Sequence, residues 1–210
     1  LVVLCSDNGP VMDDGYQDGA LEQRGDHRAG GPFRGGKYSV YEGGTRTPFI
    51  TRWKGRISPG VSTAVVSTID LAASLAALTG TALPADACGD SIDVSGALLG
   101  KPGAKGRDHY VQQDNGGTGN FGFRVGDWKL VRYETKFANN EIVEQPLQRT
   151  AQPQFQLFDL AKDPGEQTDV FAKNPEVGEK LKARLAAIVA APRSRKISVR
   201  HAPPAIALHQ

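Results

Sequence analysis

Two segments of this sequence carry side chains that could act together on an anionic group. The first is Asp7-Asn8, which follows the apolar run of residues 1–4 and precedes Gly9-Pro10. An apolar run that stops at such a breaker is typical of a buried strand, and open α/β sheets bind ligands beyond the carboxyl ends of their strands. Carboxylate and amide oxygens suit Ca²⁺, or alternatively Mg²⁺. Asp7 and Asn8 are therefore candidate metal ligands; the alternative is a simple turn after a strand.

The second segment places Lys37 after the glycine pair Gly35-Gly36 and before Glu42-Gly43-Gly44. Glycines allow the backbone to approach a ligand closely, and a lysine ammonium suits an oxygen of a sulfate or phosphate. A solvated surface lysine in a structural turn is the alternative. If one anion touches both the metal and the lysine, the Lys37 ammonium must lie within roughly 8 Å of the Asp7 carboxylate.

Composition excludes several other functions. The chain has 210 residues, enough for one large domain or two small ones, and a net charge of +2 without a basic stripe that would indicate nucleic-acid binding. No apolar run approaches the roughly 18 residues of a membrane span. The two cysteines, Cys5 and Cys88, form neither a disulfide framework nor a metal motif, although one bridge between them stays open.

The first half of the chain must position these residues with few regular elements. Residues 11–36 are polar and glycine-rich and predict a long loop, and residues 48–53 and 61–66 predict short strands. A helix is expected from Ser67 or Thr68 to Gly80, with an apolar stripe at Leu71, Leu75 and Leu78. Residues 81–107 are expected to form loops.

The second half predicts a small antiparallel sheet covered by a helix. Strands are expected at residues 109–113, 121–125, 128–133 and 155–160, with a hairpin at 126–127 and a turn at 163–165. A helix capped by Asn174 should begin at Pro175 and end at Pro192, with an apolar stripe of Val177, Leu181, Leu185 and Ile188. We therefore expect an α/β remainder over 1–105, a subdomain over 106–192 and a poorly ordered tail over 193–210.

The position of the first strand leads to a further expectation. A fully apolar central strand needs neighbours on both sides, and an unpaired one is an aggregation hazard. We therefore expect this chain to begin inside a larger protein rather than to form a stand-alone interaction domain.

Several ordered pieces of the sequence resemble the C-terminal half of the type I sulfatases, over roughly residues 1–190. The pieces are Ser6 to Gly9, Arg34 to Lys37, Tyr41 to Ile50, Trp53 to Ile57, Ser67 to Leu71, Asp127 to Val131, Leu157 to Leu160 and Asp163 to Gln167. The resemblance implies the C-terminal part of an alkaline-phosphatase-like α/β sulfatase fold, with a small antiparallel sheet and a C-terminal helix.

The resemblance also assigns roles to individual residues. Asp7 and Asn8 match the aspartate and asparagine that bind the active-site Ca²⁺, and Lys37 matches the lysine that contacts the substrate's sulfate. His27 and Arg28 lie between these segments and could contact substrate, although an exposed loop is the simpler interpretation. For five further residues the interpretation is structural: an ion pair or loop brace for Glu42 and Arg46, and packing for Tyr38, Tyr41 and Trp53.

The departures from the family pattern bear on activity. The family's formylglycine nucleophile is made from the Cys or Ser of a C/S-x-P-x-R motif, and this sequence contains no such motif. The family's paired aspartate, further lysine and two histidines lie upstream of the Asp-Asn-Gly segment. The resemblance thus implies a fragment of a sulfatase, inactive by itself, whose partner is the missing N-terminal half of the same protein.

The implied reaction is hydrolysis of a sulfate ester in a sulfated small molecule or glycan. Two alternatives stay open: a non-catalytic sulfatase-like protein that binds anions, and a phosphodiesterase or phosphonate hydrolase of the same superfamily. The residues themselves leave the compartment undetermined, and the resemblance alone implies a periplasmic or secreted protein.

Overall fold

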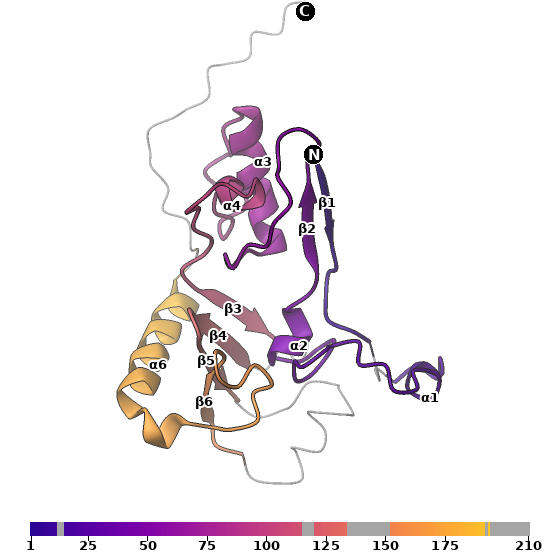
Figure 1. Cartoon of the computed structure of the whole chain (residues 1–210). Coiled ribbons are helices and arrows are strands. Elements are labelled where there is room, and N and C mark those ends of the chain that lie inside the picture. The colour runs from indigo at the N-terminus through magenta and orange to yellow at the C-terminus, as the bar shows by residue number, and fades with distance from the viewer. Residues whose placement is uncertain (12–14, 115–119, 134–151, 192, 194–210) are drawn as a thin grey trace, which may run out of the picture. The chain divides into compact units, whose positions relative to one another are not determined.

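The computed structural model describes residues 1–11, 15–114, 120–133, 152–191 and 193 (Figure 1). Contacts divide the chain into two compact units, one of Leu1–Arg52 with Asp108–Ala186 and one of Trp53–Arg107 with the residues from Ala187. One boundary therefore lies two residues from the predicted boundary at 105. The first 52 residues, however, group with the four-stranded sheet. The reason is that hydrogen bonds attach their glycine-rich loop, residues 33–48, to that part of the chain.

The first sheet of the larger unit has two strands. β1 (Val2–Cys5) pairs antiparallel with β2 (Phe49–Arg52), which confirms the strand predicted at residues 48–53. The prediction of a buried first strand is wrong for the chain as described, because Val2 is 63% and Leu4 58% exposed. Among the described strands β1 pairs with β2 alone, and the side chains of Val2 and Leu4 are left exposed.

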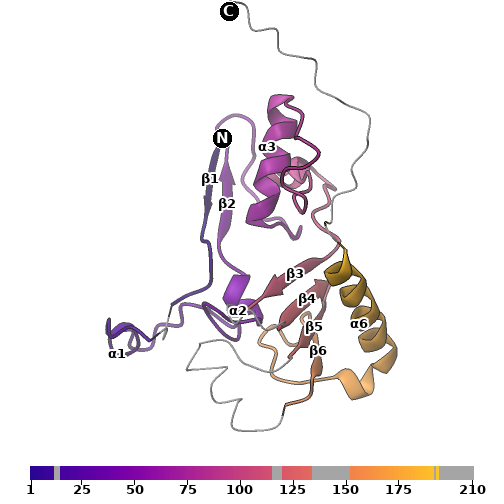
Figure 2. The ribbon, with the colours of Figure 1, turned by 180° about the vertical axis from the view of Figure 1, so that it is seen from behind.

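The second sheet has four antiparallel strands, as predicted (Figure 2). Its order follows the chain: β3 (Tyr110–Gln113), β4 (Phe121–Val125), β5 (Trp128–Arg132) and β6 (Phe155–Asp159). The two-residue connection between β4 and β5 begins at Gly126, whose φ of +59° is a conformation that glycine adopts without steric cost. The predicted hairpin is thereby confirmed.

The long helix α6 (Pro175–Ala190) lies beside this sheet in both views (Figures 1 and 2). It begins at the predicted proline, after Asn174. Leu181 and Leu185 of the predicted stripe are buried, whereas Val177 and Ile188 at its ends are half-buried. The helix therefore attaches to the sheet through the middle of its apolar stripe.

The alternation of side chains gives the four-stranded sheet two different faces. Phe123, Leu130 and Leu157 are paired in register, fully buried, and lie on the face toward α6. Lys129 directly precedes Leu130 in β5, so it lies on the opposite face, where it is also fully buried. That face meets α2 (Glu42–Thr45), a single helical turn at the end of the glycine-rich loop.

The second unit contains the short helix η1 (Thr68–Asp70), α3 (Leu71–Thr79) and α4 (Ser95–Leu98). The predicted helix start is confirmed, because the Ser67 N–H donates to the Asp70 carboxylate at 3.1 Å. The predicted end is confirmed by Gly80, whose φ is +68°. α4 lies within residues 81–107, where only loops were predicted.

Two further predictions for this unit are wrong. Residues 61–66 form no strand, and Val65 instead accepts a hydrogen bond at its carbonyl from the Arg107 N–H at 2.7 Å. Leu75 is 43% exposed, because α3 turns Ser74 inward, where its hydroxyl accepts the Val94 N–H at 3.0 Å. Hydrogen bonds to the following loop thus decide which face of α3 is buried.

Three other observations complete the description. The remaining short elements are α1 (Ala20–Gln23) and η2 (Phe171–Lys173). Cys5 and Cys88 are free thiols. Within the described residues no helix is long and apolar enough to cross a membrane. The tail over 193–210, predicted to be poorly ordered, lies outside the described residues apart from Arg193.

Candidate functional site

The candidate metal ligands form a tight polar turn directly after β1. The Asn8 N–H donates to Asp7 Oδ1 at 3.0 Å, and the Asn8 amide nitrogen donates to the Gly9 carbonyl at 2.8 Å. The Ser6 hydroxyl donates to the Asn8 carbonyl at 3.0 Å. Asp7 is exposed and Asn8 is half-buried, so their side-chain oxygens lie at the protein surface. We call residues 6–10 the strand-end turn.

Backbone hydrogen bonds bring the glycine-rich loop, here residues 33–48, to this turn. The Lys37 N–H donates to the Pro10 carbonyl at 3.0 Å, and the Gly9 N–H donates to the Gly44 carbonyl at 2.8 Å. The intervening loop therefore leaves the strand end and returns to it. The distance between the Lys37 ammonium and the Asp7 carboxylate stays a prediction.

Glycine is needed where these two segments meet. A Cβ atom on Gly9 would lie 1.8 Å from the Gly43 carbonyl oxygen, and one on Gly44 would lie 2.1 Å from the Ser39 carbonyl oxygen. In both cases the obstructing atom belongs to the backbone and cannot rotate away. Gly9 and Gly44 thus permit a backbone contact that any residue with a Cβ atom would prevent.

The glycine-rich loop is fixed to the four-stranded sheet through Glu42. Its carboxylate is 3% exposed and receives the Lys129 ammonium at 2.9 Å and the Arg124 guanidinium at 3.0 Å. Arg46, the partner suggested by the sequence, lies farther away at 3.4 Å. The structural interpretation of Glu42 and Arg46 is therefore confirmed, but the stronger partners come from β4 and β5.

Glu166 makes a second attachment from the turn after β6. Its Oε2 accepts the Glu42 N–H at 2.6 Å, and its backbone carbonyl accepts the Arg34 guanidinium at 2.9 Å. The turn itself is the predicted one, closed by the Glu166 N–H to the Asp163 carbonyl at 3.1 Å. A buried carboxylate thus holds the first N–H of α2.

The charges of this buried cluster influence one another. Burial opposes ionisation of Glu42, but the charge of Lys129, with Arg124 and Arg46, lowers the pKa of its carboxyl. Burial also disfavours the charged form of Lys129, yet the carboxylates of Glu166 and Glu42 raise its pKa. Burial raises the pKa of Glu166, against the attraction of Lys129. The ion pair between Lys129 and Glu42 is therefore the stable centre of the cluster.

Gln112 of β3 adds neutral hydrogen bonds to the same attachment. Its amide nitrogen donates to the carbonyls of Val40 and Tyr41, the latter at 3.1 Å, and its amide oxygen accepts the Thr45 hydroxyl at 2.8 Å. Sequence reasoning missed Gln112, Lys129 and Glu166 as supports of the site. The one available signal was Lys129 between the apolar residues Trp128 and Leu130 of the strand 128–132.

His27 and Arg28, the candidate substrate contacts, lie in exposed turns of the long loop. The His27 N–H donates to the Arg24 carbonyl at 3.1 Å, and the Arg28 carbonyl accepts the Gly31 N–H at 2.9 Å. These contacts shape the loop, and a role in substrate binding stays a prediction.

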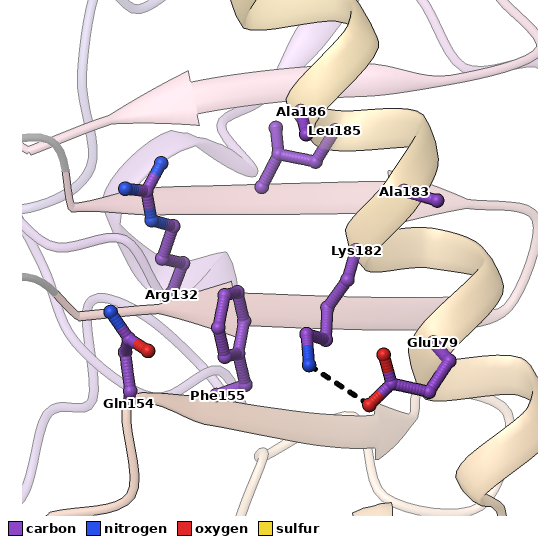
Figure 3. A pocket seen from close by; sticks show the side chains of 8 residues that line it. All are labelled: Arg132, Gln154, Phe155, Glu179, Lys182, Ala183, Leu185 and Ala186. Carbon is purple, nitrogen blue, oxygen red and sulfur yellow. Dashed lines mark hydrogen bonds and ion pairs between the residues drawn. The ribbon is translucent and has the colours of Figure 1, made fainter.

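A hollow of about 440 Å³ lies elsewhere, between the edge of the sheet and α6 (Figure 3). It is lined by Arg132, Gln154, Phe155, Glu179, Lys182, Ala183, Leu185 and Ala186. Lys182 pairs with Glu179 at 2.9 Å, and its ammonium covers the Phe155 ring at 4.7 Å. The strand register places Phe155 on the sheet face opposite Lys129, so this hollow is separate from the candidate site.

The donors of the strand-end turn fit part of a calcium shell. With the amide nitrogen of Asn8 engaged by Gly9, Oδ1 is the atom that this amide can offer a cation, beside the Asp7 carboxylate. Ca²⁺ takes 6–8 oxygen ligands. Among the described residues no group of three His, Cys, Asp or Glu could hold a metal ion. The pair fits such a shell as two of its ligands.

Comparison with known proteins gives a consistent result. The family model described as Sulfatase matches residues 1–81. The chain is 41% identical over 188 residues to an N-acetylgalactosamine-6-O-sulfatase of Bacteroides thetaiotaomicron, covering 90% of this chain and 36% of the relative. It is 34% identical to human arylsulfatase A, covering 87% of this chain and 36% of the relative. The chain thus spans about a third of the length of these relatives.

Solved structures agree with the sequence relatives. One, from work on glycosaminoglycan metabolism by Bacteroides thetaiotaomicron, superimposes with a TM-score of 0.78 at 38% identity and covers 89% of this chain and 38% of that one. The PsFucS1 sulfatase from Pseudoalteromonas superimposes with a TM-score of 0.61 at 24% identity, covering 92% of this chain and 38% of that one. The second likeness bears on the fold alone.

Proposed function

Because the chain belongs to the sulfatase family, we propose that the protein hydrolyses sulfate esters and that Lys37, Asp7 and Asn8 are part of its active site. In this reaction a sulfate ester and water give an alcohol and inorganic sulfate. The observation that carries the proposal is the pair of backbone hydrogen bonds that joins the glycine-rich loop, which contains Lys37, to the strand-end turn.

The chain's own residues bind the sulfate and stabilise its charge. The Lys37 ammonium pairs with a sulfate oxygen and neutralises the negative charge that grows as the S–O bond breaks. Asp7 and Asn8 hold a Ca²⁺ ion, which when bound polarises the sulfate oxygens as a Lewis acid. Since the 210 residues contain no C/S-x-P-x-R motif, the attacking group is proposed to lie outside them.

The proposed substrate is a sulfated saccharide. Two similar proteins support it: the relative named for N-acetylgalactosamine-6-sulfate and the solved structure from glycosaminoglycan metabolism. His27 and Arg28, exposed in the adjoining loop, are candidate contacts to the sugar. Calcium, the substrate class and these two contacts are all parts of the proposal.

The test measures turnover of a chromogenic aryl sulfate and of 6-sulfated N-acetylgalactosamine by the complete gene product with Ca²⁺. Lys37→Ala should lower kcat by about 10²–10³-fold, the usual effect of removing one donor that stabilises transition-state charge. Its thermal midpoint should change little, because Lys37 is half-buried and outside the core. The matched control is Lys54→Ala, which removes an exposed lysine of the other unit.

The outcome can contradict the proposal in three ways. Full turnover by Lys37→Ala would remove the lysine from the mechanism. Faster hydrolysis of an aryl phosphodiester than of the sulfate would favour a phosphodiesterase. Sulfate binding without turnover by the complete gene product would favour a non-catalytic anion-binding protein. The 210-residue chain alone should be inactive, because it lacks the nucleophile motif.

A further inference from the structure

A tight turn places Lys37 beside the strand end. The Ser39 N–H donates to the Gly36 carbonyl at 3.0 Å, so Lys37 and Tyr38 are the two central residues of a β-turn. Tyr38 has a φ of +76°, the value of the third position of a type II turn. That position is normally glycine, which has no Cβ atom, or asparagine, whose short polar side chain tolerates positive φ.

Tyrosine at this position is thus disfavoured by the backbone. A residue with a bulky side chain in the left-handed region is an outlier that persists only where its surroundings hold it, often at functional sites. Three non-glycine residues of the described chain have positive φ, namely Tyr38, Cys88 and Glu166. Tyr38 is next to the lysine that is proposed to bind sulfate.

The contacts of the ring suggest why tyrosine occurs here. The Lys37 ammonium lies 4.8 Å from the centroid of the Tyr38 ring, within the range of a cation–π interaction. Packing in the core explains the tyrosine at position 41 better than the one at position 38. Tyr41 is fully buried and packs edge-on against Tyr133 and Phe158, whereas Tyr38 is only half-buried.

The backbone and the side chain of Lys37 are therefore held by different groups. The hydrogen bond to Pro10 fixes the backbone, but a lysine side chain has four rotatable bonds beyond it. The Tyr38 ring lies under the ammonium and limits where the charge can go. Glycine would relax the turn and remove this restraint.

We propose that Tyr38 is a positioning residue, whose ring holds the Lys37 ammonium at the strand-end turn. The proposal differs from the sequence-based interpretation, which assigned Tyr38 to packing. The inference deepens the proposed function and rests on it for the role of Lys37 toward sulfate. The geometric part concerns only these two side chains.

The first measurement is independent of activity. In NMR spectra of the 210-residue chain, the ring current of Tyr38 should move the Lys37 Cε protons upfield. Tyr38→Phe should keep this shift, and Tyr38→Gly should abolish it. Tyr16→Gly, which removes a tyrosine that is 77% exposed, should leave the Lys37 signals unchanged. Equal Lys37 shifts in the wild type and Tyr38→Gly would overturn the proposal.

The second measurement compares activity with stability in the complete gene product. Tyr38→Gly should lower kcat/KM for an aryl sulfate by roughly three- to tenfold, the range of a partly buried cation–π contact. Its unfolding midpoint should equal or exceed that of Tyr38→Ala, because glycine relieves the turn. Tyr38→Phe should keep both properties. A residue with only a structural role would not separate activity from stability in this way.

The two proposals fail differently. If Lys37→Ala abolishes turnover but Tyr38→Gly retains full kcat/KM, the proposed function stands and the positioning role is overturned. If Lys37→Ala has no effect on turnover, the proposed function loses its lysine, and the NMR shift alone decides the contact between Lys37 and Tyr38.

Discussion

At the scale of single residues, the main feature of this chain is a cluster of three buried ionisable side chains. Glu42, Lys129 and Glu166 are each at most 3% exposed. Taking charges out of water is costly, and breaking such a group by removing one partner costs more than the group contributes over a well-packed apolar core. The cluster is therefore weak as a source of stability but strong as a constraint on where the glycine-rich loop attaches.

We expect Glu42→Gln to lower the free energy of unfolding by about 3–5 kcal/mol at neutral pH, because Lys129 would lose its nearest carboxylate. The pKa of Glu42 is lowered by folding, so its carboxylate stabilises the native state above its ordinary pKa. This contribution is lost as pH falls through the lowered pKa. The difference between wild type and variant should thus shrink in acid, measured by urea unfolding at a series of pH values.

The control for this variant is Glu179→Gln. Glu179 also pairs with a lysine, Lys182 at 2.9 Å, but its side chain is 61% exposed. Surface pairs contribute about 0–1 kcal/mol, so this variant should be nearly neutral at every pH. Equal losses in both variants, or a Glu42→Gln loss that persists unchanged in acid, would contradict the buried ion pair.

At the scale of elements, α2 shows how tertiary contacts can maintain a helix too short to form alone. It has four residues, two of them glycines, and isolated helices of this length are unstable in water. Glu166 holds its first N–H, Gln112 holds Thr45, and Gly44 in turn accepts the N–H of Gly9. The small sheet thereby supports the strand-end turn through α2.

Gly44→Ala should disturb this support. The new Cβ atom would lie 2.1 Å from the Ser39 carbonyl oxygen, so the backbone must shift, at a cost of about 1–3 kcal/mol in the free energy of unfolding. The Gly9 amide, which donates to Gly44, should exchange its hydrogen faster. Denaturant unfolding and amide hydrogen exchange measure the two effects.

Gly60→Ala is the matched control, because a Cβ atom there meets nothing within 4 Å and the residue is exposed. It should be neutral or slightly stabilising, through the smaller entropy of the unfolded chain. An equally stable Gly44→Ala variant with unchanged Gly9 exchange would show that the close backbone contact does not exist in solution.

At the scale of the whole chain, the described residues hold only part of the proposed site. The proposed ligands Asp7 and Asn8 would supply two of the 6–8 oxygens that Ca²⁺ takes. The chain spans about a third of the length of its curated relatives, and the exposed apolar side chains of β1 belong to the same region as the ligands. The metal affinity of these 210 residues is therefore expected to be low.

We predict that about 1 mM Ca²⁺ raises the free energy of unfolding of the 210-residue chain by less than about 0.5 kcal/mol, which corresponds to a Kd in the millimolar range or weaker. Asp7→Ala should remove even this effect, whereas Asp86→Ala, which changes an exposed carboxylate of the other unit, should retain it. Tight stoichiometric binding in a calorimetric titration would refute the partial shell.

The sequence by itself determined the elements whose signals are local. The strands at 121–125 and 128–132, the Gly126 hairpin, the turn at 163–166 and the helix from Pro175 depend on alternation and turn chemistry within a few residues. The ordered motifs also indicated the family, and with it the candidate residues Asp7, Asn8 and Lys37. These inferences need no knowledge of which distant segments meet.

Only the tertiary structure decided the contacts between distant segments. Glu42 meets Lys129 across 87 positions and Glu166 across 124, and nothing in the local pattern of any of them specifies the partner. The exposure of β1 was mispredicted, and the burial of Ser74 was not predicted, for the same reason. Periodicity shows that a face is apolar, but the neighbours that arrive when the chain closes decide whether that face is covered, and by what.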